Sequence, residues 1–202
     1  MTIEAIHRVI EQHAATRGDL VAITDPDRSC SYRELNYRSN AVARYLIAAG
    51  FRRGGHVSVR MSRGIDLAVV LLATLKAGGS YAWTEADRSE SSDPIGVSLS
   101  AGGDGAETRY LHLELAGVLA EPVSCCPNLP ILTRGSDIAC VLTDGDGSSV
   151  MVPHATVTAL RARAVTHPTP WTGEPGAFDL WMALMAGTTA LVDCQAAGIV
   201  AA

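Results

Sequence analysis

The sequence predicts an α/β fold, and three observations carry this prediction. Apolar residues recur at helical spacing in some segments and at every second position in others, and the two patterns take turns along the chain. Glycine, proline and aspartate separate these segments at short intervals. Of the 202 residues 48% are apolar and 18% are charged, a composition that supports a packed core. We expect a layered α/β/α arrangement around one mostly parallel sheet.

The first part of the chain contains the most clearly specified elements. Ile3, Ile6, Ile10 and Ala14 mark one face of a first helix, because they recur at helical spacing. A Ser-x-x-Glu sequence at 31–34 has the form of a capping box, in which the serine hydroxyl and the glutamate satisfy amides at the start of a helix. Further elements are predicted as a strand at 21–24, a helix from the capping box to Gly50 with that glycine in the left-handed conformation, a strand at 56–60, a buried helix at 65–77 and a strand at 80–83.

The rest of the chain is less regular. Residues 89–105 are rich in Ser, Gly and Asp and predict loops around a short strand, whereas 138–142 is a compact apolar run typical of a central parallel strand. The remaining expectations are a strand near 110–115, a polar glycine loop at 143–149, an extended piece at 150–152, a helix at 154–165, a linker at 167–176, a helix at 178–186 and a strand at 189–192. We expect one domain over residues 1–202, in three parts: 1–88, an irregular connector at 89–136 with short strands, and 137–202.

Charge and cysteine usage narrow the class of protein. The net charge of −5 and the absence of a long run of Lys and Arg exclude an electrostatic footprint for nucleic acid. Charged residues interrupt the N-terminal segment, so we expect no signal peptide, and the most apolar stretch, 67–75, is too short to span a membrane. We therefore expect a cytoplasmic protein with reduced cysteines. We expect no metal site, because no cysteine has metal-ligand spacing.

Four segments carry recognisable motifs: SYRELN at 31–36, LKAGGSY at 75–81, VMVPH at 150–154 and FDLWMALMAG at 178–187. In this order they resemble the adenylate-forming, AMP-binding enzymes, and among them the amino-acid adenylation domains of nonribosomal peptide synthetases. The resemblance implies part of the large N-terminal domain of these enzymes. In the family the adenine pocket, the magnesium-binding acid and the lid with its catalytic lysine follow later in the chain, so we expect a truncated domain.

The phosphate-binding loop is where the sequence departs from the family. The family's loop reads approximately YTSGTTGxPKG, in which amides, hydroxyls and a lysine hold the phosphates of ATP. The corresponding residues here are Thr143, Asp144, Gly145, Asp146, Gly147, Ser148 and Ser149. The lysine and proline are absent and two carboxylates are present, and two like charges about 4 Å apart cost about 4 kcal/mol at a surface-like dielectric. We expect neither productive ATP binding, nor catalytic residues, nor activity of the chain alone.

Several single residues leave two interpretations open. Asp179 matches the family aspartate that receives the amino group of the substrate, or it is a carboxylate stabilised by the N-terminus of a helix. Lys76 is the only lysine and lies at a helix end, where a cation is favoured, and His154 lies at a helix start; we expect structural roles for both. The tryptophans are either anchors of a protein interface or core residues: Trp83, Trp171 and Trp181.

Three functions fit these observations. The preferred one is a non-catalytic, adenylation-domain-like protein of a nonribosomal peptide or related natural-product pathway, which binds or stabilises a partner enzyme and needs no cofactor. Truncation would expose apolar faces, and such faces favour a protein partner or self-association. The alternative is an amino-acid-activating, AMP-forming ligase fragment that uses ATP and magnesium together with a partner chain. A decayed remnant is the third. We expect neither a nucleic acid nor a membrane as a partner.

Overall fold

The computed structural model describes residues 5–84, 96–100, 118, 125–130, 133–143, 148–160, 166–171 and 177–192. Within them the helices are α1 (Ile6–Thr16), α2 (Tyr32–Ala48), α3 (Ile65–Lys76), α5 (His154–Ala159) and α6 (Phe178–Ala186). The strands are β1 (Val21–Thr24), β2 (Ser29–Ser31), β3 (His56–Arg60), β4 (Ser80–Thr84), β5 (Gly96–Ser100), β6 (Ile138–Thr143), β7 (Ser149–Pro153), β8 (Thr169–Pro170) and β9 (Ala190–Leu191). The predicted α/β class is confirmed, but the strands form two sheets where one was expected.

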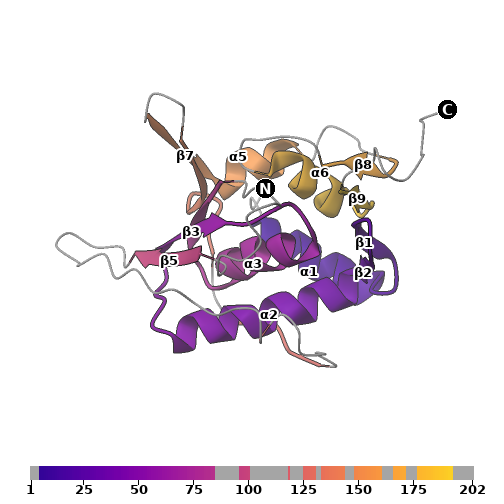
Figure 1. Cartoon of the computed structure of the whole chain (residues 1–202), viewed down its shortest axis with the longest axis horizontal. Coiled ribbons are helices and arrows are strands. Elements are labelled where there is room, and N and C mark those ends of the chain that lie inside the picture. Colours follow the sequence, from indigo (N-terminus) through magenta and orange to yellow (C-terminus); the bar gives the residue numbers. More distant parts are fainter. Residues whose placement is uncertain are drawn as a thin grey trace.

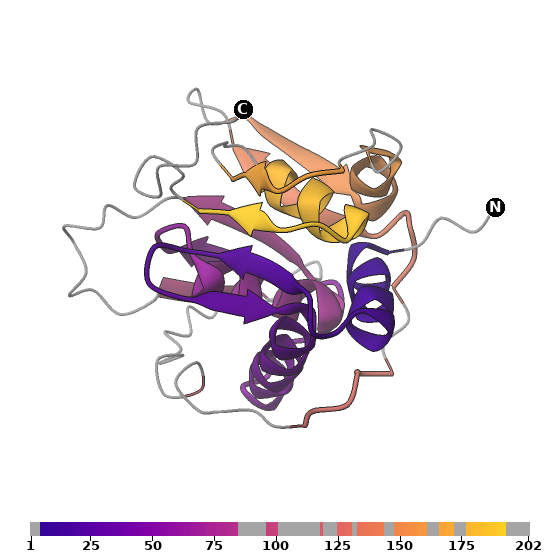
Figure 2. The ribbon, with the colours of Figure 1, turned by 90° about the vertical axis from the view of Figure 1, so that its right-hand side faces the viewer.

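The larger sheet has the strand order β5-β3-β4-β6-β7. Its three central strands, β3, β4 and β6, are parallel, and the strands at the two edges, β5 and β7, run antiparallel to their neighbours. The smaller sheet has the order β2-β1-β9-β8, in which β9 is parallel to both β1 and β8. Figure 2 shows β1 and β9 side by side, so the smaller sheet joins the two ends of the described chain.

The helices pack between and below the sheets. In Figure 1 the strands of the larger sheet lie to the left and those of the smaller sheet to the right, with α1, α3 and α6 between them and α2 beneath. α2 packs along α3, and α1 contacts α2, α3, α5 and α6. α3 is buried around nearly its whole circumference, with Asp66 partly exposed, as its almost entirely apolar sequence predicts.

The ends of α2 are specified as the sequence predicts. The Ser31 hydroxyl accepts a hydrogen bond from the Glu34 amide at 3.2 Å, which is one half of the capping box. The Glu34 carboxylate lies 3.9 Å from Arg38, in a weak ion pair one turn along the helix. Gly50 has a φ of 99°, and the Phe51 amide donates to the Leu46 carbonyl at 2.9 Å. These contacts form a Schellman motif, so the predicted left-handed end is confirmed.

The end of α3 repeats this motif and fixes the approach of two segments. Gly78 has a φ of 80°, and the Gly79 amide donates to the Thr74 carbonyl at 3.1 Å. A Cβ on Gly79 would lie 2.2 Å from the Phe51 ring and 2.8 Å from the Gly55 carbonyl oxygen. The two glycines therefore have separate roles: the first turns the chain, and the second lets β3 and β4 begin side by side.

The second part of the chain shows the differences from the prediction. β2 and β8 were not predicted, because each has only two or three residues and takes its conformation from the strand beside it. β5 is the short strand expected among the loops of 89–105. The strand expected near 110–115 and the end of the helix predicted at 154–165 lie outside the described residues.

Candidate functional site

The predicted phosphate loop joins two antiparallel neighbours. β6 ends at Thr143 and β7 begins at Ser149, and these two residues are paired across the strands, with their hydroxyl oxygens 3.5 Å apart. Asp144, Gly145, Asp146 and Gly147 lie outside the described residues, and Ser148 is exposed. Thr143, the last residue of β6, lies at the carboxyl end of a parallel strand, and open α/β sheets bind their ligands at that end of their strands.

The only lysine of the chain does not serve this loop. Lys76 is buried at the end of α3, where its ammonium donates to side chains of α2. Its Nζ lies 2.5 Å from Asn36 Oδ1, 2.6 Å from Asn40 Oδ1 and 3.3 Å from the Asn36 carbonyl oxygen. The prediction of a structural role is therefore right, but directed hydrogen bonds with three oxygens account for the burial of this ammonium better than the helix dipole alone does.

The same cluster joins four segments of the chain. The Asn36 and Asn40 amides each donate to Asn128 Oδ1 at 2.9 Å, and Asn40 also donates to the Cys126 carbonyl at 2.7 Å. The Glu11 carboxylate of α1 lies 3.9 Å from the Lys76 ammonium. Burial lowers the pKa of Lys76 to about 7, and the Glu11 carboxylate opposes that shift. We call this set, Glu11, Asn36, Asn40, Lys76 and Asn128, the lysine cluster.

His154 is held in the neutral state by a second buried contact. Its Nδ1 accepts a hydrogen bond from the Ile6 amide at 3.3 Å, so it satisfies an amide at the start of α1, where no side chain of α1 provides a cap. Acceptance at Nδ1 requires that nitrogen to carry no proton. Burial lowers the pKa of His154 to about 4, while the negative charge of Asp137 opposes this shift. Burial also lowers the pKa of His7, whose ring centroid lies 5.9 Å from that of His154.

The His154 contact predicts loss of stability in acid. The pKa of His154 in the folded state lies below its ordinary value of 6.5, so the unfolded chain binds the proton first as the pH falls. We expect this residue to remove about 3 kcal/mol of unfolding free energy between about pH 7 and pH 4, and nothing above that window. Urea unfolding of the wild type and of His154→Asn at a series of pH values measures it. The asparagine oxygen can accept from the same amide but does not titrate, so parallel curves for the two proteins would contradict the prediction.

Asp179 is the second residue of α6 and lies in its first turn, and the N-cap residue Ala177 has a φ of 58°. Its side chain is half-buried. A carboxylate at this position interacts favourably with the helix N-terminus. The position is therefore the one that the helix-start interpretation requires, and a role in binding a substrate amine stays a hypothesis.

The three tryptophans belong to the core. Trp171 and Trp181 are fully buried, and the half-buried Trp83 packs against Trp171 with ring centroids 5.8 Å apart. The indole of Trp181 donates to the Tyr81 hydroxyl at 2.6 Å, and that of Trp83 donates to the Met61 carbonyl at 3.0 Å. The core interpretation is confirmed for Trp171 and Trp181, which their burial excludes as anchors for a partner, and Trp83 packs at the edge of the same core.

The described cysteines are free thiols. Cys30, Cys126 and Cys140 are buried and Cys125 is exposed, while Cys194 lies outside the described residues. Burial raises the pKa of Cys30 to about 12 and that of Cys140 to about 11, so both stay protonated and unreactive at neutral pH. Among the described residues, no three metal-ligating side chains come together, and no helix has both the length and the apolar character of a membrane span.

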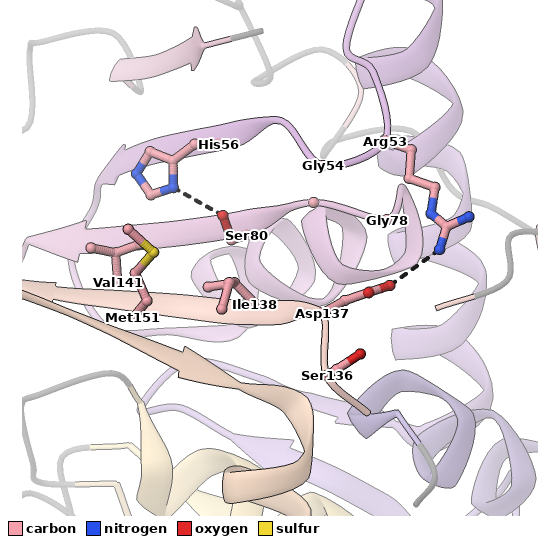
Figure 3. A pocket seen from close by; sticks show the side chains of 11 residues that line it. Arg53, Gly54, His56, Gly78, Ser80, Ser136, Asp137, Ile138, Val141 and Met151 are labelled. Carbon is pink, nitrogen blue, oxygen red and sulfur yellow. Dashed lines mark hydrogen bonds and ion pairs between the residues drawn. The ribbon is translucent and has the colours of Figure 1, made fainter. Parts of the chain in front are cut away.

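The structure contains a hollow that the sequence did not indicate. It has a volume of about 670 Å³ and lies at the amino ends of β3, β4 and β6, opposite to the phosphate-loop end of the sheet. Figure 3 shows His56 and Ser80 on one side and the Arg53–Asp137 ion pair on another. Three of its wall positions are glycines, Gly54, Gly78 and Gly79, and a glycine in the sequence indicates a turn but not a hollow.

Comparison with known proteins relates the first part of the chain to one family. Residues 10–91 match the AMP-binding enzyme family. The chain is 41% identical over 78 residues to malpibaldin synthetase of Mortierella alpina, and these residues make up 39% of this chain and 1% of that protein. It is 29% identical over 183 residues to the large subunit of L-2-aminoadipate reductase of Eremothecium gossypii, which is 81% of this chain and 13% of that protein.

Solved structures share the fold across nearly the whole chain. The N-terminal subdomain of NpsA from Klebsiella oxytoca, in complex with 3-hydroxyanthranilyl-AMSN, superimposes with a TM-score of 0.73 at 18% identity, over 94% of this chain and 53% of that one. The nonribosomal peptide synthetase FmoA3 in an AMPPNP-bound form gives a TM-score of 0.74 at 19% identity, over 95% of this chain and 23% of that one. The chain thus spans about half the length of the NpsA subdomain and a small fraction of the curated relatives.

Proposed function

This chain is related to the adenylation domains of nonribosomal peptide synthetases, and from that premise we propose that it is a non-catalytic relative that acts by binding a protein partner. We place it in the cytoplasm, in a pathway that makes a peptide or a related natural product. The partner we propose is an enzyme of that pathway, which the chain would stabilise or recruit.

The position of the only lysine carries this proposal. A loop that holds ATP needs positive charge near the phosphates, because backbone amides alone neutralise little of a polyanion. Lys76 is buried in the lysine cluster and bonded to Asn36 and Asn40, so it cannot reach a ligand at the end of β6. The loop contributes Asp144 and Asp146 in its place. The donor set therefore does not fit ATP with magnesium, and we derive no adenylation step.

The edge of the larger sheet supports binding to a protein. β7 is an edge strand, and it exposes two large apolar side chains, Val150 (60% exposed) and Met151 (68% exposed). An edge strand offers unpaired backbone groups, and exposed apolar side chains beside them favour association. These features are consistent with a binding role and do not depend on nucleotide chemistry.

Amino-acid-dependent exchange between ATP and pyrophosphate tests the loss of catalysis. We expect no exchange above background with any proteinogenic amino acid, under conditions in which an active adenylation domain gives a strong signal. Co-purification of the tagged chain with enzymes of its own pathway tests the partner, and we expect a stoichiometric complex with one of them. Exchange by the isolated chain would overturn the proposal. Exchange that arises only when a second chain is added would support the ligase-fragment alternative instead.

A charge-neutral loop makes this test sharper. Because Asp144 and Asp146 would repel a triphosphate, the double substitution Asp144→Asn, Asp146→Asn should strengthen binding of ATP with magnesium by about tenfold or more. Calorimetry on the wild type and the double variant measures the difference, with Asp19→Asn as a control for a change of exposed charge elsewhere. Equal and tight binding by wild type and variant would contradict the repulsion on which the proposal depends.

A further inference from the structure

The hollow at the amino ends of β3, β4 and β6 lies on the outer face of β3, over which the strand directions require no crossover helix. β5 pairs with β3 on the side away from β4, and it runs antiparallel to β3. If β5 were parallel to β3, the chain would have to cross over from β4 to β5 through a helix. The right-handed crossover rule would place that helix on the outer face of β3. The antiparallel direction requires no such helix. Val57 and Val59 point into the core. His56, which precedes Val57, lies on the outer face, where the hollow is.

The polar groups of the hollow carry no net charge. Arg53 Nη2 lies 3.2 Å from Asp137 Oδ2, which also accepts from the Arg134 amide at 2.9 Å. Burial lowers the pKa of His56, so its ring is neutral at neutral pH, and its Nδ1 lies 3.1 Å from Ser80 Oγ. A charged ligand would have to leave one partner of the ion pair uncompensated, and an uncharged polar ligand would not.

The wall of glycines does not form an anion site. The Gly54 amide donates to the Gly78 carbonyl at 2.8 Å, the Gly78 amide to Leu75, and the Gly79 amide to Thr74, the last two at 3.1 Å. These donors are engaged and cannot cradle a phosphate or stabilise an oxyanion beside Ser80. The His56–Ser80 pair is therefore suited to binding and not to nucleophilic catalysis.

The remaining lining is apolar apart from Ser136. Ile138, Val141 and Met151 lie along one side of the hollow in Figure 3, and the Met151 side chain is 68% exposed. Methionine sulfur and branched aliphatic groups pack well against an aromatic ring. A volume of about 670 Å³ is that of a site for a small organic molecule.

We propose that this hollow binds a small uncharged carboxamide with an aromatic body. The amide oxygen accepts from Arg53 and the amide N–H donates to the Asp137 carboxylate, so each member of the ion pair gains a partner. The ring lies against Val141 and Met151, and the His56–Ser80 pair meets a polar substituent at the inner end. The site is separate from the phosphate loop, and the proposal stands whether or not the chain binds a protein.

Amide-resolved NMR with naphthamide as the probe tests this site. We expect saturable shifts at Gly54, Gly78 and Gly79 and at the Met151 methyl, with a dissociation constant on the order of 0.1 to 1 mM for a ligand of this size. Naphthoic acid and methyl naphthoate keep the ring but lack the uncharged N–H donor, and we expect each to bind at least tenfold more weakly. N-acetylphenylalaninamide is a second probe. If it binds more tightly than naphthamide, the natural ligand is a peptide amide, and if it binds more weakly, the ligand is a free aromatic amide.

A pair of arginines supplies the matched control. Arg53→Gln removes the group that recognises the amide oxygen, and we expect binding at least tenfold weaker. Arg52→Gln removes an exposed cation one residue away that does not line the hollow, and we expect binding within twofold of the wild type. The proposal fails if no saturable shift occurs, if the acid binds as well as the amide, or if Arg53→Gln binds like the wild type while its spectrum shows an intact fold.

Discussion

Replacing Lys76 with alanine is expected to lower the free energy of unfolding by about 3–5 kcal/mol, because it removes the centre of a buried polar cluster. The ammonium donates to two oxygens of Asn36 and one of Asn40. The two side-chain oxygens would lose this donor inside the protein, whereas the Asn36 carbonyl keeps the Ser39 hydroxyl at 3.0 Å. The substitution also leaves a void where the lysine stem packs. Urea unfolding at pH 7 measures the loss as a lower transition midpoint with an unchanged slope.

Two further variants separate the causes of this loss. Lys76→Met fills most of the same volume but cannot donate, so we expect a loss of about 1–3 kcal/mol from the unpaired acceptors. Arg52→Ala removes a cation from an exposed position and should change stability by less than about 0.5 kcal/mol. A Lys76→Ala protein whose free energy of unfolding lies within about 1 kcal/mol of the wild type, the scale of one hydrogen bond, would show that Asn36 and Asn40 find other donors. The cluster would then not hold α2 and α3 together.

Local patterns predicted the elements whose ends are set by neighbouring residues. The limits of α2 follow from Ser31 and Gly50, and the turn after α3 follows from Gly78, because capping and left-handed turns depend on a few adjacent positions. β3, β4 and β6 were found for a similar reason, since each buries a compact apolar set. The resemblance to adenylation domains came from the same segments.

Long-range contacts explain what the patterns could not predict. Lys76 lies 36 residues from Asn40 and 40 from Asn36 in the sequence. Its position at a helix end therefore suggested an interaction with the helix dipole, and its hydrogen-bond partners could not be predicted. The two motifs that carry the family resemblance in this region, one with Asn36 and one with Lys76, are joined by these bonds. The hollow was also missed, because it is lined by side chains from four strands, β3, β4, β6 and β7, and from the turns before them.

The two ends of the larger sheet carry different polar groups and are therefore suited to different ligands. The carboxyl end of β6 leads into Asp144 and Asp146 and is the end at which open α/β sheets hold ligands, and the connecting segment 144–148 contains neither lysine nor arginine. The amino end of the sheet has a hollow lined by the Arg53–Asp137 ion pair and the Ser80 hydroxyl. The amides of its glycine wall already donate to backbone carbonyls. This division is the reason for proposing a binding role and not a displaced ATP site.

The second large effect is expected at Trp181, which joins α6 to the larger sheet. Its side chain is fully buried, its indole donates to the Tyr81 hydroxyl at 2.6 Å, and the two ring centroids lie 6.3 Å apart. Trp181→Ala removes this contact and opens a cavity, so we expect a loss of about 3–5 kcal/mol of unfolding free energy. Urea unfolding monitored by circular dichroism measures it, because the signal does not depend on the deleted fluorophore.

A conservative variant and a surface variant decide what the tryptophan does. Trp181→Phe keeps a ring in the core but loses the indole donor, and we expect a loss of about 1–3 kcal/mol. Met151→Ala removes an exposed apolar side chain and should change stability by less than about 0.5 kcal/mol. If Trp181→Ala were as stable as the wild type, α6 would not be anchored through this residue.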